Sequence, residues 1–151
     1  MKLQQLQKKL NEEGLSLIAD RQGELYTSKL HGIGPIINPM KEDIYYFEDA
    51  IVVDKVIGKA TAMLLILSKV KYIYAYVLSE KAKEILEYYH VSYDCEKVVP
   101  YIINRTHDGM CPMEKTVYDM NDLDEAFIAL KHKPVSYTHL RAHETTANLV
   151  C

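Results

Sequence analysis

Long apolar runs and blocks of basic residues are both absent from this sequence. No run approaches the roughly 20 apolar residues of a membrane-spanning helix, and the first residues do not have the pattern of a signal peptide. The chain has 18 basic and 21 acidic residues, which gives a net charge of −3. We therefore expect neither a membrane partner nor electrostatic binding of nucleic acid.

Cysteine is scarce, with three residues in the whole chain, of which Cys95 and Cys111 precede the final segment. Their spacing matches neither a disulfide framework nor a paired metal-ligand motif. This usage is typical of proteins in a reducing compartment, so we expect a cytoplasmic location. Internal repeats and low-complexity segments are also absent before the final segment, and the length suits one domain with one core.

We expect the final segment to differ in origin from the rest of the chain. From Val135, the sequence Val-Ser-Tyr-Thr-His-Leu-Arg-Ala-His-Glu-Thr and the closing Leu-Val-Cys are the in-frame translation of a transposase-type sequencing adapter around a barcode. We expect residues 1–133 to form a single domain and residues 134–151 to be a non-native, unstructured tail. The pattern His139, His143 and Glu144 lies in this tail, so we give it no weight as a metal site.

The spacing of apolar and turn-forming residues predicts the order of the structural elements. The expected helices cover 2–13, 80–89 and 98–104, and further helices begin at Lys59, near Cys111 and after a cap at Asn121. The expected strands cover 15–20, 24–27, 50–53, 70–78 and 91–95 (an edge strand), with turns at 21–23 and 54–58, a connector at 28–40 and a helix or turn at 42–48. This order predicts an α/β fold of three layers, in which helices cover both faces of a mixed sheet of about five strands.

The stretch 49–65 predicts where a site lies. Its apolar run ends in a tight turn, and a helix begins directly afterwards at Lys59. Such a unit points the unpaired N–H groups of a helix start at the carboxyl edge of a sheet, where open α/β sheets hold ligands. We expect ligand-binding residues here at Asp54, Lys55, Gly58 and Lys59.

Several short sequence motifs match one family. They are Gly32-Ile33-Gly34-Pro35, the segments 50–60 and 74–80, Asn104-Arg105 and Cys111-Pro112-Met113-Glu114. Together they resemble the small bacterial and archaeal family catalogued as domain of unknown function 1893, over about residues 15–130. The resemblance implies a cytidine-deaminase-like fold without the zinc of the deaminases.

The residues at the zinc positions agree with that implication. A zinc deaminase has a His or Cys followed two residues later by Glu at one helix start, and Pro-Cys-x-x-Cys at the next. In this sequence, Gly58-Lys59-Ala60 stands where the first motif would be. The segment 110–114 stands where the second motif would be, and it contains one Cys and one Glu. Catalytic zinc takes three protein ligands, so we expect no metal, no cofactor and no zinc-dependent deamination.

If the fold carries over, two helix starts near Lys59 and Pro112 face each other across the vacated metal position. Their partial positive charges, with Lys55, Lys59 and Arg105, favour an anion. The first hypothesis is therefore a metal-free protein that binds a small anionic or nucleotide-like ligand.

Other interpretations stay open for the same residues. Lys59 also suits a salt bridge with Asp54, Arg105 also suits a solvated loop, and Glu114 is expected to balance the lysines. Cys111 beside a helix start has the setting of a reactive thiolate, which gives a second hypothesis, a Cys111-dependent enzyme acting on an anionic or nucleotide-derived substrate. Cys111 equally suits a packed, small apolar side chain. An interaction subunit is a third option, and the sequence leaves the oligomeric state open.

Overall fold

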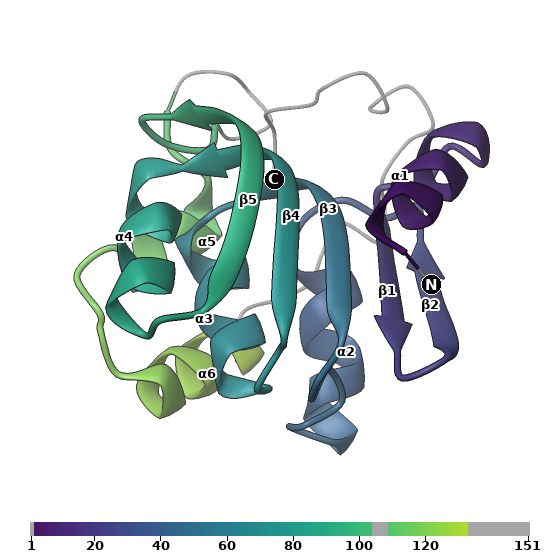
Figure 1. The fold of residues 1–151 in the computed structure, drawn as a ribbon. Coiled ribbons are helices and arrows are strands. Elements are labelled where there is room, and N and C mark those ends of the chain that lie inside the picture. Colours follow the sequence, from purple (N-terminus) through teal and green to yellow (C-terminus); the bar gives the residue numbers. More distant parts are fainter. Residues whose placement is uncertain (1, 104–108, 133–151) are drawn as a thin grey trace.

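The computed structural model describes residues 2–103 and 109–132, so Arg105 and the tail 134–151 lie outside the described residues. Figure 1 shows the fold. The helices are α1 (Leu3–Glu12), α2 (Gly34–Glu42), α3 (Lys59–Leu67), α4 (Glu80–Tyr88), α5 (Pro112–Val117) and α6 (Leu123–Lys131). The strands are β1 (Leu17–Arg21), β2 (Glu24–Ser28), β3 (Ile51–Ile57), β4 (Tyr72–Ser79) and β5 (Ser92–Val99).

The five strands form one mixed sheet in the order β2-β1-β3-β4-β5, which confirms the predicted α/β sheet and places β5 at an edge. β1 is antiparallel to both of its neighbours, whereas β3, β4 and β5 are parallel. The carboxyl ends of the three parallel strands therefore meet at one edge of the sheet. The start of β1 reaches the same edge, because Leu17 pairs with Asp54.

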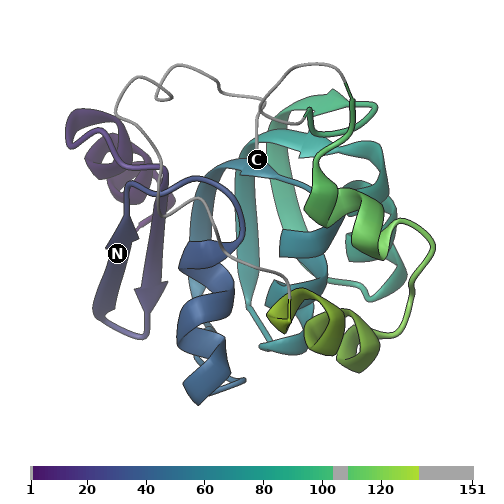
Figure 2. The same cartoon turned by 180° about the vertical axis from the view of Figure 1, so that it is seen from behind.

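Helices lie on both faces of the sheet, as Figures 1 and 2 show. Helix α1 packs on β1 and β3, where its Leu6 and Leu10 meet Ile18 and Val53. The alternate strand residues, such as Ala19, point to the opposite face and join the main core beneath the other helices. Helix α3 is apolar on nearly every side because it contacts the sheet as well as α2, α4, α5 and α6. No helix in residues 2–103 or 109–132 has the length and apolar character required to cross a membrane.

Two predicted elements are wrong, and strand pairing explains both. The predicted turn 54–58 is instead the second half of β3, because Val56 pairs with Val77 and Ile57 with Leu78. The predicted helix 98–104 is not formed, because β5 continues through Val99 along β4. Long-range hydrogen bonds of this kind override the local preference of a short segment.

Helix α2 replaces most of the predicted connector. Pro35 lies at its start, where a missing N–H is harmless. Pro39 lies inside the helix and cannot donate to the carbonyl of Pro35. The hydroxyl of Tyr26 donates to that carbonyl instead, at 2.6 Å. The start of α6 also differs from the prediction, because Asp122 and not Asn121 is its N-cap.

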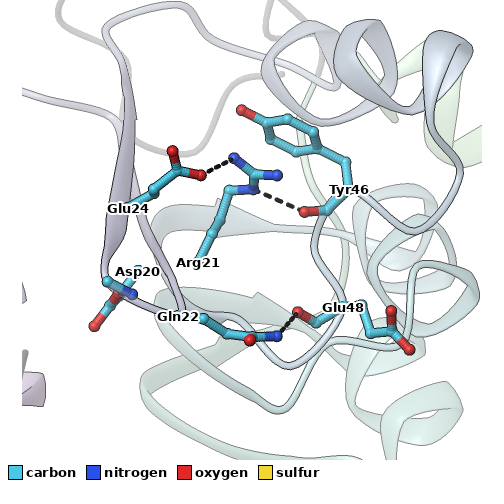
Figure 3. A network of polar contacts seen from close by, with 7 residues as sticks. Asp20, Arg21, Gln22, Glu24, Tyr46 and Glu48 are labelled. Carbon is cyan, nitrogen blue, oxygen red and sulfur yellow. Dashed lines mark hydrogen bonds and ion pairs between the residues drawn. The ribbon is translucent and has the colours of Figure 1, made fainter.

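A polar network ties the β1–β2 hairpin to the connection before β3, as Figure 3 shows. The Arg21 Nε donates to the carbonyl of Tyr46 at 2.8 Å, and the guanidinium carbon lies 3.5 Å from the centre of the Tyr46 ring. The pairing of Asp20 with Ile51 places this network at the opposite end of the sheet from Asp54. We therefore assign it to the stability of the hairpin and not to the site.

Candidate functional site

A carboxylate from α5 caps the N-terminus of α3. Gly58 is the N-cap residue and has no side chain that accepts a hydrogen bond. Glu114 accepts instead, with Oε1 at 2.7 Å from the N–H of Lys59 and Oε2 at 2.9 Å from the N–H of Ala60. A bound anion at a helix start receives bonds of the same kind. The anion position expected at this helix is therefore filled by the protein's own carboxylate.

Gly58 makes this arrangement possible by the space that it leaves. A Cβ at Gly58 would lie closer than 3.0 Å to the carboxylate of Glu114, which real Cβ atoms essentially never do. The φ of Gly58 is −100°, which any residue adopts, so the requirement is one of space and not of backbone conformation. The glycine at position 58 is thus explained by its neighbour Glu114 from α5.

The side chain of Lys59 leads away from this position. Its Nζ donates to the carbonyl of Tyr118 at 2.9 Å and borders a cleft of about 350 Å³ beside α4. Among the described residues no carboxylate oxygen lies within 4.0 Å of this Nζ, so a salt bridge with Asp54 is not formed. Contrary to expectation, the amine does not share a cavity with Cys111.

A smaller cavity of about 40 Å³ lies at the carboxyl end of β3. It brings together five of the seven predicted site residues, namely Asp54, Lys55, Gly58, Cys111 and Glu114. Lys59 belongs here only through its backbone N–H, and Arg105 lies outside the described residues.

Asp54 is a titratable group in this cavity with a strongly shifted pKa. Its side chain is half-buried, and its carboxylate accepts a long hydrogen bond from the N–H of Val56 at 3.4 Å. Burial raises the pKa of the Asp54 carboxyl to about 7, and the backbone N–H groups of Val56 and Lys55 offset this only in part. A carboxyl that titrates near neutrality inside a cavity is typical of functional sites.

Glu114 and Cys111 also line this cavity. Burial raises the pKa of Glu114 above its ordinary value, although the N–H groups of Ala60 and Lys59 and the charge of Lys59 oppose this shift. Cys111 is 1% exposed, packs with Val77 in a small apolar cluster and is the N-cap residue of α5.

Sequence reasoning missed three polar residues of this cavity, Ser16, His31 and Thr61. Ser16 donates from Oγ to the carbonyl of Leu30 at 2.6 Å, which holds the loop next to His31 against the start of β1. The available signal for His31 was its place directly before the motif 32–35 that matches the family, and the sequence reasoning did not use it. No signal pointed to Ser16, because only the pairing of β1 with β3 brings it to this edge.

Groups of three or more His, Cys, Asp or Glu side chains with a geometry suited to a metal ion are not found within residues 2–103 and 109–132. The polar side chains that border the small cavity include Ser16, His31, Asp54, Lys55, Thr61 and Glu114. Their chemistry suits hydrogen bonding and proton transfer to a small ligand.

Comparison with known proteins decides the family. A family model described as TM1506, domain of unknown function (DUF1893), matches residues 5–133. The chain belongs to the DUF1893 family. A crystal structure of a DUF1893 family protein (TM1506) from Thermotoga maritima is similar to it, with a TM-score of 0.79 and 29% identity. That match covers 85% of this chain and 87% of the other. The curated proteins contain no match. Membership confirms the family resemblance and assigns no activity.

Proposed function

We propose that this DUF1893 protein binds a small ligand with an anionic group, without a metal, in the cavity at the carboxyl end of β3. Asp54 carries the proposal, because its carboxyl has a pKa of about 7 and borders a cavity at the sheet edge where α/β folds hold ligands. A protonated carboxyl donates a hydrogen bond to an anionic oxygen. The bound anion in turn favours the protonated form of Asp54.

The size of the cavity limits what enters it. About 40 Å³ holds only a few water-sized groups, far less than the roughly 300–1,000 Å³ of sites for drug-sized ligands. A carboxylate or phosphoryl group is the part that we expect inside. The rest of a nucleotide-like ligand would lie at the mouth, near the half-buried Lys55, whose charge supports an anion.

The proposal includes a metal-free, deaminase-like origin of the site. It is supported by the family resemblance and by the residues at the two former metal positions. Gly58 offers no ligand, and Glu114 is engaged by two backbone N–H groups of α3. Cys111 borders the same cavity but is almost fully buried, and the Cys111-dependent enzyme stays a prediction.

The test is thermal unfolding of the protein with succinate, citrate and nucleoside monophosphates between pH 6 and pH 9. A ligand at 100 times its dissociation constant adds about 2.7 kcal/mol to the free energy of unfolding. We expect the affinity for succinate, whose own charge is nearly constant above pH 6, to fall toward tenfold per pH unit above pH 7.

Asp54→Asn keeps a donor but no longer titrates, so we expect its affinity to be independent of pH. Asp124→Asn, an exposed residue of α6, is the matched control and should behave as the wild type. The proposal fails if none of these probes stabilises the protein, or if Asp54→Asn and Asp124→Asn show the same pH dependence.

A further inference from the structure

A second cleft lies on the other side of the start of α3, between α4 and the connection from α5 to α6, which Figure 1 shows beside each other. Its volume of about 350 Å³ is within the range of small-molecule sites. The wall includes Lys59, Lys81, Glu84, Tyr118 and Asp119. The cleft shares no side chain with the cavity of Asp54, so a role for this cleft does not depend on anion binding in that cavity.

The side chain of Lys59 is buried, and its amine has no ion-pair partner among residues 2–103 and 109–132. The residue is 4% exposed, and the carbonyl of Tyr118 is the acceptor of its Nζ at 2.9 Å. The described residues place no carboxylate oxygen within ion-pair distance of this atom. Burial of a charge with so little compensation is costly, so the environment favours the neutral amine. A neutral amine still donates to Tyr118 and has a lone pair besides.

A second lysine strengthens this effect. The Nζ of Lys81, from α4, lies 4.7 Å from the centre of the Tyr118 ring and borders the same cleft. Burial, followed by the charge of Lys81, lowers the pKa of the Lys59 amine. Three nearby acids oppose this shift without cancelling it, namely Asp119, Glu114 and Glu84.

We propose that Lys59 is an imine-forming lysine, whose amine condenses with a small aldehyde or ketone that carries an acidic group held by Lys81. A desolvated lysine beside another cation is a known way to make an amine nucleophilic at neutral pH. The Nζ lone pair forms a bond to the carbonyl carbon, and the carbonyl oxygen leaves as water with the two protons of the amine. The step consumes no oxidant or reductant.

Reductive trapping tests this inference. The protein is incubated at pH 7 with pyruvate or glyoxylate and sodium cyanoborohydride, and the labelled lysines are found by peptide mass spectrometry. An ordinary lysine is neutral in about one molecule of two thousand at pH 7, and each unit by which its pKa falls raises this fraction about tenfold. We expect Lys59 to be labelled at least about tenfold faster than Lys83, an exposed lysine of α4.

Two matched variants separate the role of Lys81 from a general effect of charge. Lys81→Gln should slow the labelling of Lys59 several-fold, whereas Lys83→Gln, on the same helix but outside the cleft, should leave it unchanged. Equal labelling of Lys59 and Lys83 would overturn the inference, and so would equal rates in the two variants.

The wild type provides a readout that does not depend on the folding of a variant. The rate of labelling at Lys59 should level off with pH well before the ordinary lysine pKa of about 10.4. A rate that rises without an inflection up to about pH 10 would overturn the inference.

Discussion

Gly58 and Glu114 fit against each other, because the missing Cβ of Gly58 leaves the space in which the carboxylate of Glu114 lies. That carboxylate accepts hydrogen bonds from the first two N–H groups of α3. The contact joins α5 to the start of α3 and forms one wall of the candidate cavity. This pair of residues therefore links α5 to the start of α3 at the candidate cavity.

We predict that Gly58→Ala lowers the free energy of unfolding by about 1–3 kcal/mol, because the new methyl group displaces a buried carboxylate from two hydrogen bonds. When Gly58→Ala is made in the Glu114→Ala variant, it should lower the free energy of unfolding by less than about 0.5 kcal/mol, because the Glu114 side chain no longer fills the space beside position 58. Urea unfolding of the four proteins measures this coupling. Additive effects of the two substitutions would contradict the assigned contact.

We predict that Asp54→Asn stabilises the protein at pH 8. The pKa of Asp54 is about 7 in the folded protein and 3.8 for an ordinary aspartate, so the unfolded chain loses its proton first as the pH rises. The stability linked to this proton is complete below pH 4 and is lost between about pH 4 and pH 7. A shift of about three units corresponds to at most about 4 kcal/mol, and we expect a gain of roughly 1–4 kcal/mol.

The stability gain from Asp54→Asn should depend on pH, and this dependence serves as the control. Below pH 4 the wild type and Asp54→Asn should have nearly equal stability, because the carboxyl is protonated in both the folded and the unfolded chain. Urea unfolding from pH 4 to pH 8 tests this, and parallel curves for the two proteins would show that burial does not raise the pKa of Asp54.

We predict that Tyr26→Phe destabilises the protein by about 1–2 kcal/mol. The ring keeps its packing against Tyr46 and Phe47, but the carbonyl of Pro35 loses its donor, which Pro39 cannot replace. Thermal unfolding compares this variant with Tyr45→Phe, whose exposed hydroxyl should matter little. Equal effects of the two substitutions would mean that the bond to Pro35 contributes nothing.

Much of the fold was predictable from local patterns. The amphipathic spacing of α1, the serine before α4 and the helix that begins at Lys59 all appear as expected. The errors lie where distant segments decide the outcome. Segment 54–58 contains residues typical of a turn, yet β4 extends β3 through it, and so Asp54 and Lys55 are presented from a strand.

The place of the candidate cavity was predictable, but its details were not. The change from strand to helix at 57–59 indicated the edge of the sheet at which this cavity lies, and five of the seven predicted residues border it. The direction of Lys59 was not predictable, because its partner Tyr118 comes from a segment 59 residues away. The same holds for the carboxylate at the start of α3, which comes from Glu114.

The sequence by itself determined the alternation of strands and helices and the family to which the chain belongs. These properties follow from residue type and short spacing. Only the tertiary structure decided which anion caps α3, which cavity each lysine faces and why position 58 is a glycine. Those outcomes depend on contacts between α3 and the segment 112–121, whose packing fixes distances that no local pattern encodes.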